Sequence, residues 1–140
     1  MRIALALLVA AGSIAHADCP KPVLDAIAKT FPKASLNRCT AEKEHGREQF
    51  EARLVRADGA RLEVDLAPDG TILQIEEAIA LDKLPAAVSK AFAARYPKGK
   101  ATGAEKQTAG KVVTYEIKFD LGAARKEATF DESGKFVEEE

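Results

Sequence analysis

The chain has 140 residues, of which 46% are hydrophobic and 31% are charged, with 21 basic and 22 acidic side chains. This length suits one compact domain or two very small ones. The balanced charge gives no bulk attraction to nucleic acid or to an anionic membrane, and a chain with no tryptophan and 6% aromatic residues has few stacking platforms for single strands. We therefore expect no nucleic-acid partner.

Residues 1–17 have the pattern of a secretory signal peptide. Arg2 is followed by an apolar run over residues 3–11, which is too short to span a bilayer, and small side chains at Ala15 and Ala17 precede the expected cleavage site. We predict cleavage after Ala17, a periplasmic or secreted product, and no membrane span in the rest of the chain. The alternatives are a buried N-terminal helix and a lipid anchor at Cys19; an acidic residue directly before that cysteine disfavours the anchor.

Two cysteines, Cys19 and Cys39, remain in the exported chain. In an oxidising compartment we expect them to form a disulfide, which stabilises by about 3 kcal/mol in the chain-entropy model. The alternative is a pair of free buried thiols. Neither cysteine belongs to a C-x-x-C motif, so a redox-active pair is not indicated.

The chain repeats itself at an offset of 65 residues. The segment 20–33 (PKPVLDAIAKTFPK) matches 85–98 (PAAVSKAFAARYPK), including the prolines at both ends. Apolar residues at helical spacing within each segment predict one amphipathic helix per copy, begun near the first proline and ended by the second.

Strand patterns follow each predicted helix. Segment 50–54 aligns with 115–119 at the same offset, and 66–72 aligns with 130–136 at an offset of 64. Apolar and polar residues alternate over 50–55, 61–66 and 115–120, and Asp-Gly pairs at 58–59 and 69–70 predict hairpin turns. Each copy is expected to begin with a weaker strand, at 35–42 and 101–106, and to end with a short one, at 72–77 and 136–139.

These patterns predict an α+β fold of two tandem α-β-β-β-β repeats, residues 18–79 and 80–140, after a signal peptide of residues 1–17. The helices are expected on one face of an antiparallel sheet, and the other face is expected to be open and polar. The side chains predicted to point outward from this open face, as a partner-binding surface, are Glu51, Arg53, Arg61, Glu63, Asp65, Glu116, Lys118 and Asp120.

The repeat resembles the PepSY-like family, which is grouped with the beta-lactamase inhibitor protein-like fold. The resemblance rests on a helix ending in aromatic-Pro-Lys, on Tyr-Glu-Ile-Lys-Phe at 115–119, and on Phe-Asp-x-x-Gly-Lys-Phe-Val at 130–137. It covers both repeats and is clearest over 84–137. It implies an exported bacterial protein that binds or inhibits another protein. The chain departs from the better-known inhibitor by being shorter and having only two cysteines.

The sequence contains few candidate catalytic residues. The exported chain has one histidine, His45, in a polar segment, and we interpret it as a solvated turn residue; the alternatives are a metal ligand and a catalytic base. No nucleophile motif or phosphate-binding loop is present, and the carboxylates alternate with bases along strands, as on a solvated sheet face. We therefore expect no enzyme, metal or cofactor.

The function expected from the sequence is non-catalytic binding or inhibition of another envelope or extracellular protein, such as a peptidase or hydrolase, through the open sheet face. Mixed charge on a rigid sheet suits electrostatically steered docking. The alternative is a small-ligand-binding or sensory envelope protein, which requires a pocket that the sequence does not reveal. The identity of the protein partner is unknown.

Overall fold

The computed structural model describes residues 19–140, so the predicted signal peptide lies outside the described residues. The chain forms an α-β-β-β-β unit twice, as predicted. The helices are α1 (Lys21–Thr30) and α2 (Ala86–Arg95), with a short 3-10 helix η1 (Leu81–Lys83) between the two units. The strands are β1 (Ser35–Glu44), β2 (Arg47–Val55), β3 (Arg61–Leu66), β4 (Ile72–Ile79), β5 (Lys100–Ala109), β6 (Val112–Leu121), β7 (Ala124–Asp131) and β8 (Phe136–Glu139).

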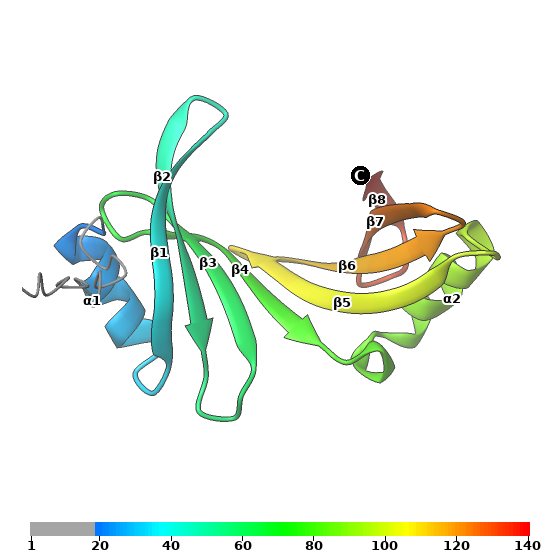
Figure 1. The fold of residues 1–140 in the computed structure, drawn as a ribbon, viewed down its shortest axis with the longest axis horizontal. Helices are drawn as coiled ribbons and strands as arrows, with labels where there is room; N and C mark the ends of the chain where they lie inside the picture. The colour runs from blue at the N-terminus through cyan, green and yellow to red at the C-terminus, as the bar shows by residue number, and fades with distance from the viewer. Residues whose placement is uncertain (1–18) are drawn as a thin grey trace, which may run out of the picture.

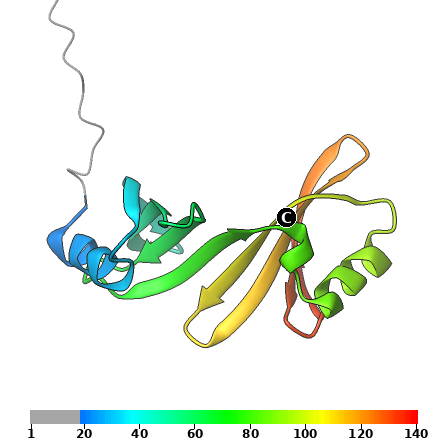
Figure 2. The same ribbon diagram turned by 90° about the horizontal axis from the view of Figure 1, so that it is seen from below.

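All eight strands belong to one antiparallel sheet whose spatial order is the order of the chain (Figure 1). The two repeats join where β4 pairs with β5, from Ile75 opposite Thr108 to Ile79 opposite Ala104. Figures 1 and 2 show the two helices near opposite ends of the elongated molecule, each covering the strands of its own repeat. The repeats therefore share a continuous sheet while each helix packs locally.

Prolines set the ends of both helices. Pro20 and Pro85 are the N-caps, and their backbone is extended. The sequence pattern predicts both within the first helical turn, so each lies one position earlier than predicted. Pro32 and Pro97 follow the C-caps, because a proline disfavours helical backbone in the residue before it. Each helix has ten residues, and within 19–140 no helix is long and apolar enough to cross a membrane.

Each helix buries a short apolar stripe against its own half of the sheet. In α1, Val23 and Ile27 are buried and pack with β2 and β3. In α2, Val88 and Phe92 are buried and pack with a separate cluster from β6 and β7. Because a ten-residue helix is marginal alone, these contacts hold it in place.

Glycines in equivalent turns show how closely the two repeats correspond. Gly70 and Gly134 adopt left-handed backbone, with φ of 88° and 86°. A Cβ atom at either position would lie 2.5 Å from a carbonyl oxygen of the helix in the same repeat, that of Pro22 or Ala87. Only glycine allows both this backbone and this approach of turn to helix.

The aromatic residues that follow the helices differ between the repeats. Tyr96 is buried, its ring centroid lies 4.5 Å from that of Phe119, and its hydroxyl donates a hydrogen bond to Glu139 of β8. Phe31, at the equivalent position, packs against the first core with part of its ring exposed. Both rings therefore pack against the sheet of their own repeat, and Tyr96 is the more deeply buried of the two.

A disulfide joins Cys19, just before α1, to Cys39 in β1, as predicted. The two Cα atoms are 6.1 Å apart, within the range that disulfide geometry allows. Both cysteines are buried in the core of the first repeat. The bond therefore fixes the start of α1 to the outermost strand of the sheet.

Candidate protein-binding face

One face of the sheet is free of helices. Side chains that pack under a helix alternate along each strand with side chains of this second face, which we call the open face. All eight outward-pointing residues predicted from the sequence lie on it: Glu51 and Arg53 of β2, Arg61, Glu63 and Asp65 of β3, and Glu116, Lys118 and Asp120 of β6. Their role in binding stays a prediction.

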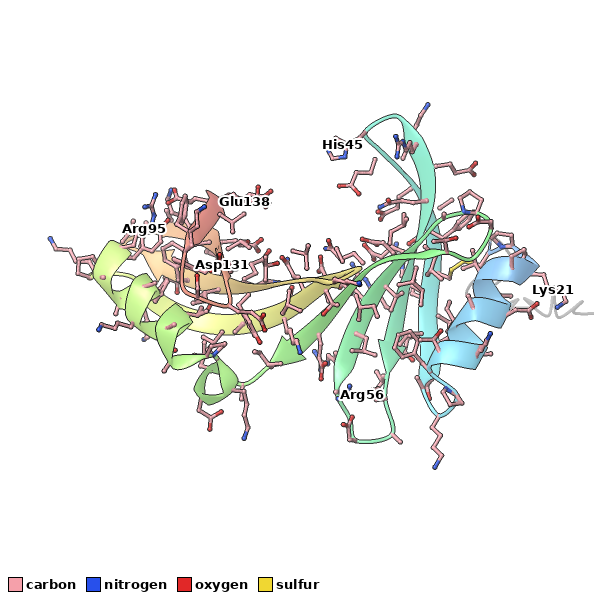
Figure 3. The ribbon with its side chains drawn as sticks, turned by 180° about the vertical axis from the view of Figure 1, so that it is seen from behind. Lys21, His45, Arg56, Arg95, Asp131 and Glu138 are labelled. Atoms are coloured by element: carbon pink, nitrogen blue, oxygen red, sulfur yellow. A yellow bond between two sulfur atoms is a disulfide. The ribbon has the colours of Figure 1, made fainter. Side chains whose placement is uncertain are left out.

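The open face is concave because the sheet bends between the two repeats. In Figure 3 the β1–β2 hairpin, with His45 at its tip, rises on one side of this face, and the end of the chain near Glu138 rises on the other. His45 and Gly46 have φ of 49° and 78°, which is typical of a two-residue hairpin turn. His45 lies in this turn with its imidazole exposed, which agrees with its interpretation as a solvated turn residue. Within 19–140, no three side chains of His, Cys, Asp or Glu are grouped to hold a metal ion.

The structure adds residues to the open face that the sequence analysis did not select. They come from β4, β5 and β7 and surround the junction of the repeats: Glu76, Ala78, Glu105, Gln107 and Glu127. The sequence predicts a short strand at 72–77 and a weak one at 101–106. However, a bulge near Leu66 shifts the register between β3 and β4, so the pattern alone does not say which β4 side chains face outward.

Equivalent basic residues make ion pairs on the open face in both repeats. Arg53 Nε lies 2.8 Å from a carboxylate oxygen of Glu51 and 3.4 Å from one of Glu63. Lys118, 65 residues later, donates a hydrogen bond of 2.8 Å to Glu105. Because these groups are partly exposed, each pair contributes only about 0–1 kcal/mol. The bases are thus positioned by the protein's own carboxylates.

Acidic side chains also face one another across the strands. The sheet register places Glu51 opposite Asp65, Glu63 opposite Glu76, and Glu105 opposite Glu116. Directly opposed like charges destabilise a sheet. Burial, followed by the nearby carboxylates of Glu127 and Glu105, raises the pKa of Glu116 from 4.5 to about 7. Burial, followed by the carboxylates of Glu76 and Glu51, raises the pKa of Asp65 from 3.8 to about 6.

We expect Glu116→Gln to stabilise the protein at pH 8 and to change little at pH 5. The raised pKa means that folding favours the protonated carboxyl, so the contribution of Glu116 to stability is greatest below pH 4.5 and is lost as pH rises to about 7. The shift corresponds to about 3 kcal/mol for a fully buried group, and solvent access at this half-buried position reduces the expected effect to about 1 kcal/mol.

Urea unfolding of Glu116→Gln and the parent protein between pH 5 and pH 8 measures this difference. Glu132→Gln, in the exposed turn before β8, is the control and should show no such trend. A Glu116→Gln effect that is equal at both pH values would contradict the assigned electrostatic cause.

A broad hollow of about 540 Å³ lies on the open face where the repeats meet. Arginines line one side of it and carboxylates line the other, while the small side chain of Ala78 lies opposite Glu105 in the sheet register. The residues that line it are Asn37, Arg38, Arg53, Leu54, Val55, Arg61, Leu62, Glu63, Glu76, Ala78 and Glu105. The hollow combines apolar surface from Leu54, Val55, Leu62 and Ala78 with charged groups of both signs, which can form hydrogen bonds and ion pairs with a partner.

Comparison with solved structures finds the same fold in proteins from Bacteroides species. A “putative periplasmic” protein from Bacteroides eggerthii superposes with a TM-score of 0.74 at 20% identity, over 87% of this chain and 88% of that one. A BLIP-like protein from Bacteroides fragilis superposes with a TM-score of 0.68 at 21% identity, over 86% and 84% of the two chains. At these identities the likeness shows the fold alone. A search of curated proteins found no match.

The sequence itself identifies the family. Residues 48–138, from β2 to β8, match the family described as “Putative beta-lactamase-inhibitor-like, PepSY-like”. This match covers most of the chain and agrees with the resemblance found in the repeated segments. The chain belongs to the PepSY-like, beta-lactamase-inhibitor-like family.

Proposed function

We propose that this protein is an exported, non-catalytic binding protein that docks on another envelope or extracellular protein through its open face, in the manner of a peptidase or hydrolase inhibitor. The observation that carries the proposal is one continuous concave polar surface, contributed by both repeats and covered by no helix. Proteins of beta-lactamase-inhibitor-like families are usually non-catalytic, which supports a binding role.

Three observations support export. The predicted signal peptide at residues 1–17 directs the chain out of the cytoplasm, with cleavage after Ala17. The Cys19–Cys39 disulfide suits an oxidising compartment. A protein of the same fold from Bacteroides eggerthii is described as “putative periplasmic”. We place the exported protein in the periplasm or outside the cell, with repeats at residues 18–79 and 80–140.

The open face favours a protein partner over a small ligand. Small-ligand sites are mostly enclosed and apolar with a few polar groups. The hollow at the junction is instead part of a wide surface lined with charged side chains of both signs. Such a surface suits the steering and registration of a protein of complementary charge.

A bulky side chain at the centre of the open face tests the proposal. Ala78 is exposed on β4, and Ala94 is exposed on the outer surface of α2. Envelope extract is passed separately over three immobilised proteins: the parent and the variants Ala78→Trp and Ala94→Trp. The bound proteins are quantified by mass spectrometry. We expect Ala78→Trp to retain at least tenfold less of the captured partner, because the indole fills the hollow, and Ala94→Trp to behave as the parent does.

A photo-reactive residue at position 78 provides the second readout. It should cross-link the partner that the parent protein captures, whereas the same residue at position 94 should not. Equal capture by Ala78→Trp, together with cross-linking from position 94, would place recognition on the helices and contradict the proposal.

A further inference from the structure

Five neighbouring strands each contribute one glutamate to the middle of the open face. These side chains, which we call the glutamate belt, are Glu63 of β3, Glu76 of β4, Glu105 of β5, Glu116 of β6 and Glu127 of β7. Because neighbouring strands are about 4.8 Å apart, the belt extends about 19 Å across the sheet. It crosses the junction of the two repeats and borders the hollow around Ala78.

The belt has few positive charges of its own. Lys118 pairs with Glu105, and Arg53 approaches Glu63 at one end. Glutamines partner the middle of the belt: Gln74 donates a hydrogen bond of 2.5 Å to Glu76, and Gln107 donates one of 3.0 Å to Glu116. Within the described chain, no ion pair is found for the belt carboxylates of β4, β6 and β7. Negative charge therefore exceeds positive charge along the belt.

The fold does not require this arrangement. The apolar cores lie on the opposite face, so these glutamates contribute nothing to the packing under the helices. Two pairs within the belt, Glu63 with Glu76 and Glu105 with Glu116, are directly opposed like charges, which disfavour the sheet. Natural proteins commonly keep destabilising arrangements where function needs them.

We propose that the glutamate belt binds a segment of a partner protein that carries several lysine or arginine side chains, an inference that rests on the open face being the docking surface. Charge complementarity supplies the argument: an approaching ammonium or guanidinium group neutralises carboxylates that now repel one another. The hollow beside Ala78 gives room for the aliphatic stem of such a side chain next to Glu76 and Glu105.

The acid-base behaviour of the belt agrees with this role. Glu116 faces Glu105 of β5, Glu127 of β7 and Glu76 of β4, with Lys118 beside it on β6, and its carboxyl has a pKa of about 7. Bound cations favour the ionised carboxylates, so binding of a basic segment should strengthen as pH rises from 6 to 8. Binding should also weaken as salt is added, because screening shortens the range of the attraction.

Labelled peptides test the proposal with the purified protein. The probe is a fluorescent twelve-residue peptide of alternating Lys and Ser, with Glu-Ser and Gln-Ser peptides as controls, followed by anisotropy at low salt. We expect binding of the Lys-Ser peptide alone. The variant E76Q/E105Q/E116Q/E127Q should weaken it at least tenfold, whereas D25N/E48Q/D82N/E132Q, which removes the same charge from exposed positions elsewhere, should change it less than twofold.

A lysine built into the belt is the second test. Gln107 lies opposite Glu76 and contacts Glu116, so Gln107→Lys places an ammonium where the partner's would lie. We expect a higher melting temperature at pH 8 and at least fivefold weaker peptide binding. Equal loss of binding in the two quadruple variants, or no binding of the Lys-Ser peptide, would overturn the proposal. If Ala78→Trp still abolishes capture of the envelope partner in that case, the docking surface stands and only the basic chemistry of the partner is wrong.

Discussion

Phe119→Ala is expected to lower the free energy of unfolding by about 3–5 kcal/mol, the range for loss of a fully buried phenylalanine ring. Phe119 is 1% exposed in the middle of β6. Its ring centroid lies 5.1 Å from that of Phe92, edge to face, and 4.5 Å from that of Tyr96. Alanine would leave a cavity under α2 beside both of these rings.

The size of this loss matters because small domains are stable by only about 5–15 kcal/mol. Urea unfolding followed by circular dichroism measures it. Val112→Ala is the control on the same strand, since Val112 is 64% exposed, and it should change stability by less than about 0.5 kcal/mol. Leu54, the equivalent of Phe119 in the first repeat, is 2% exposed, and Leu54→Ala should cost about 2–5 kcal/mol. A loss below about 1 kcal/mol for Phe119→Ala would mean that the second core is not packed as described.

The sequence predicted the elements of this fold well because each one is specified locally. Helical spacing and flanking prolines located α1 and α2, and alternation at Phe50–Leu54 and Tyr115–Phe119 identified strands and their buried sides. The matches at offsets of 65 and 64 residues then indicated two similar units. The outward direction of the eight predicted residues on β2, β3 and β6 follows from the same alternation.

Glu63 and Glu116 of the glutamate belt were predicted to face outward, but Glu76, Glu105 and Glu127 were not, because their place beside them depends on contacts between distant strands. Which residue of β4 lies beside which residue of β5 is decided by how the repeats pack together, and no local pattern encodes the pairing of Glu76 with Gln107. The strand at β5 is also weakly patterned, with a run of small and polar residues around Gly103. The burial and raised pKa of Glu116 likewise appear only when β4 to β7 are assembled.

Removal of the disulfide is expected to lower the free energy of unfolding by about 3 kcal/mol, because an unfolded chain without the cross-link gains the entropy of a free loop. Cys19 and Cys39 are 20 positions apart and both lie in the first core. Cys19→Ser with Cys39→Ser removes the bond and also places two hydroxyl groups in an apolar cluster, so this variant combines two effects.

The second repeat supplies the matched variant that separates them. Leu84 and Ala104 occupy the positions equivalent to Cys19 and Cys39, and Ala104 is 5% exposed in β5. Cys19→Leu with Cys39→Ala therefore replaces the disulfide by side chains that already pack in the same surroundings. We expect this apolar variant to lose about 3 kcal/mol and the serine variant to lose about 1–3 kcal/mol more, from unpaired buried hydroxyls.

Urea unfolding of both variants and of the parent, with and without reductant, distinguishes these contributions. Reductant should destabilise the parent to near the level of the apolar variant and should leave both variants unchanged. The disulfide ties α1 to the edge strand β1. In hydrogen exchange of the variants, the amides of α1 and β1 should therefore lose protection first, while those of β5 to β7 stay protected. Equal protection loss in both repeats would instead mean that the shared sheet unfolds as one unit, with the bond at its edge acting on the whole molecule.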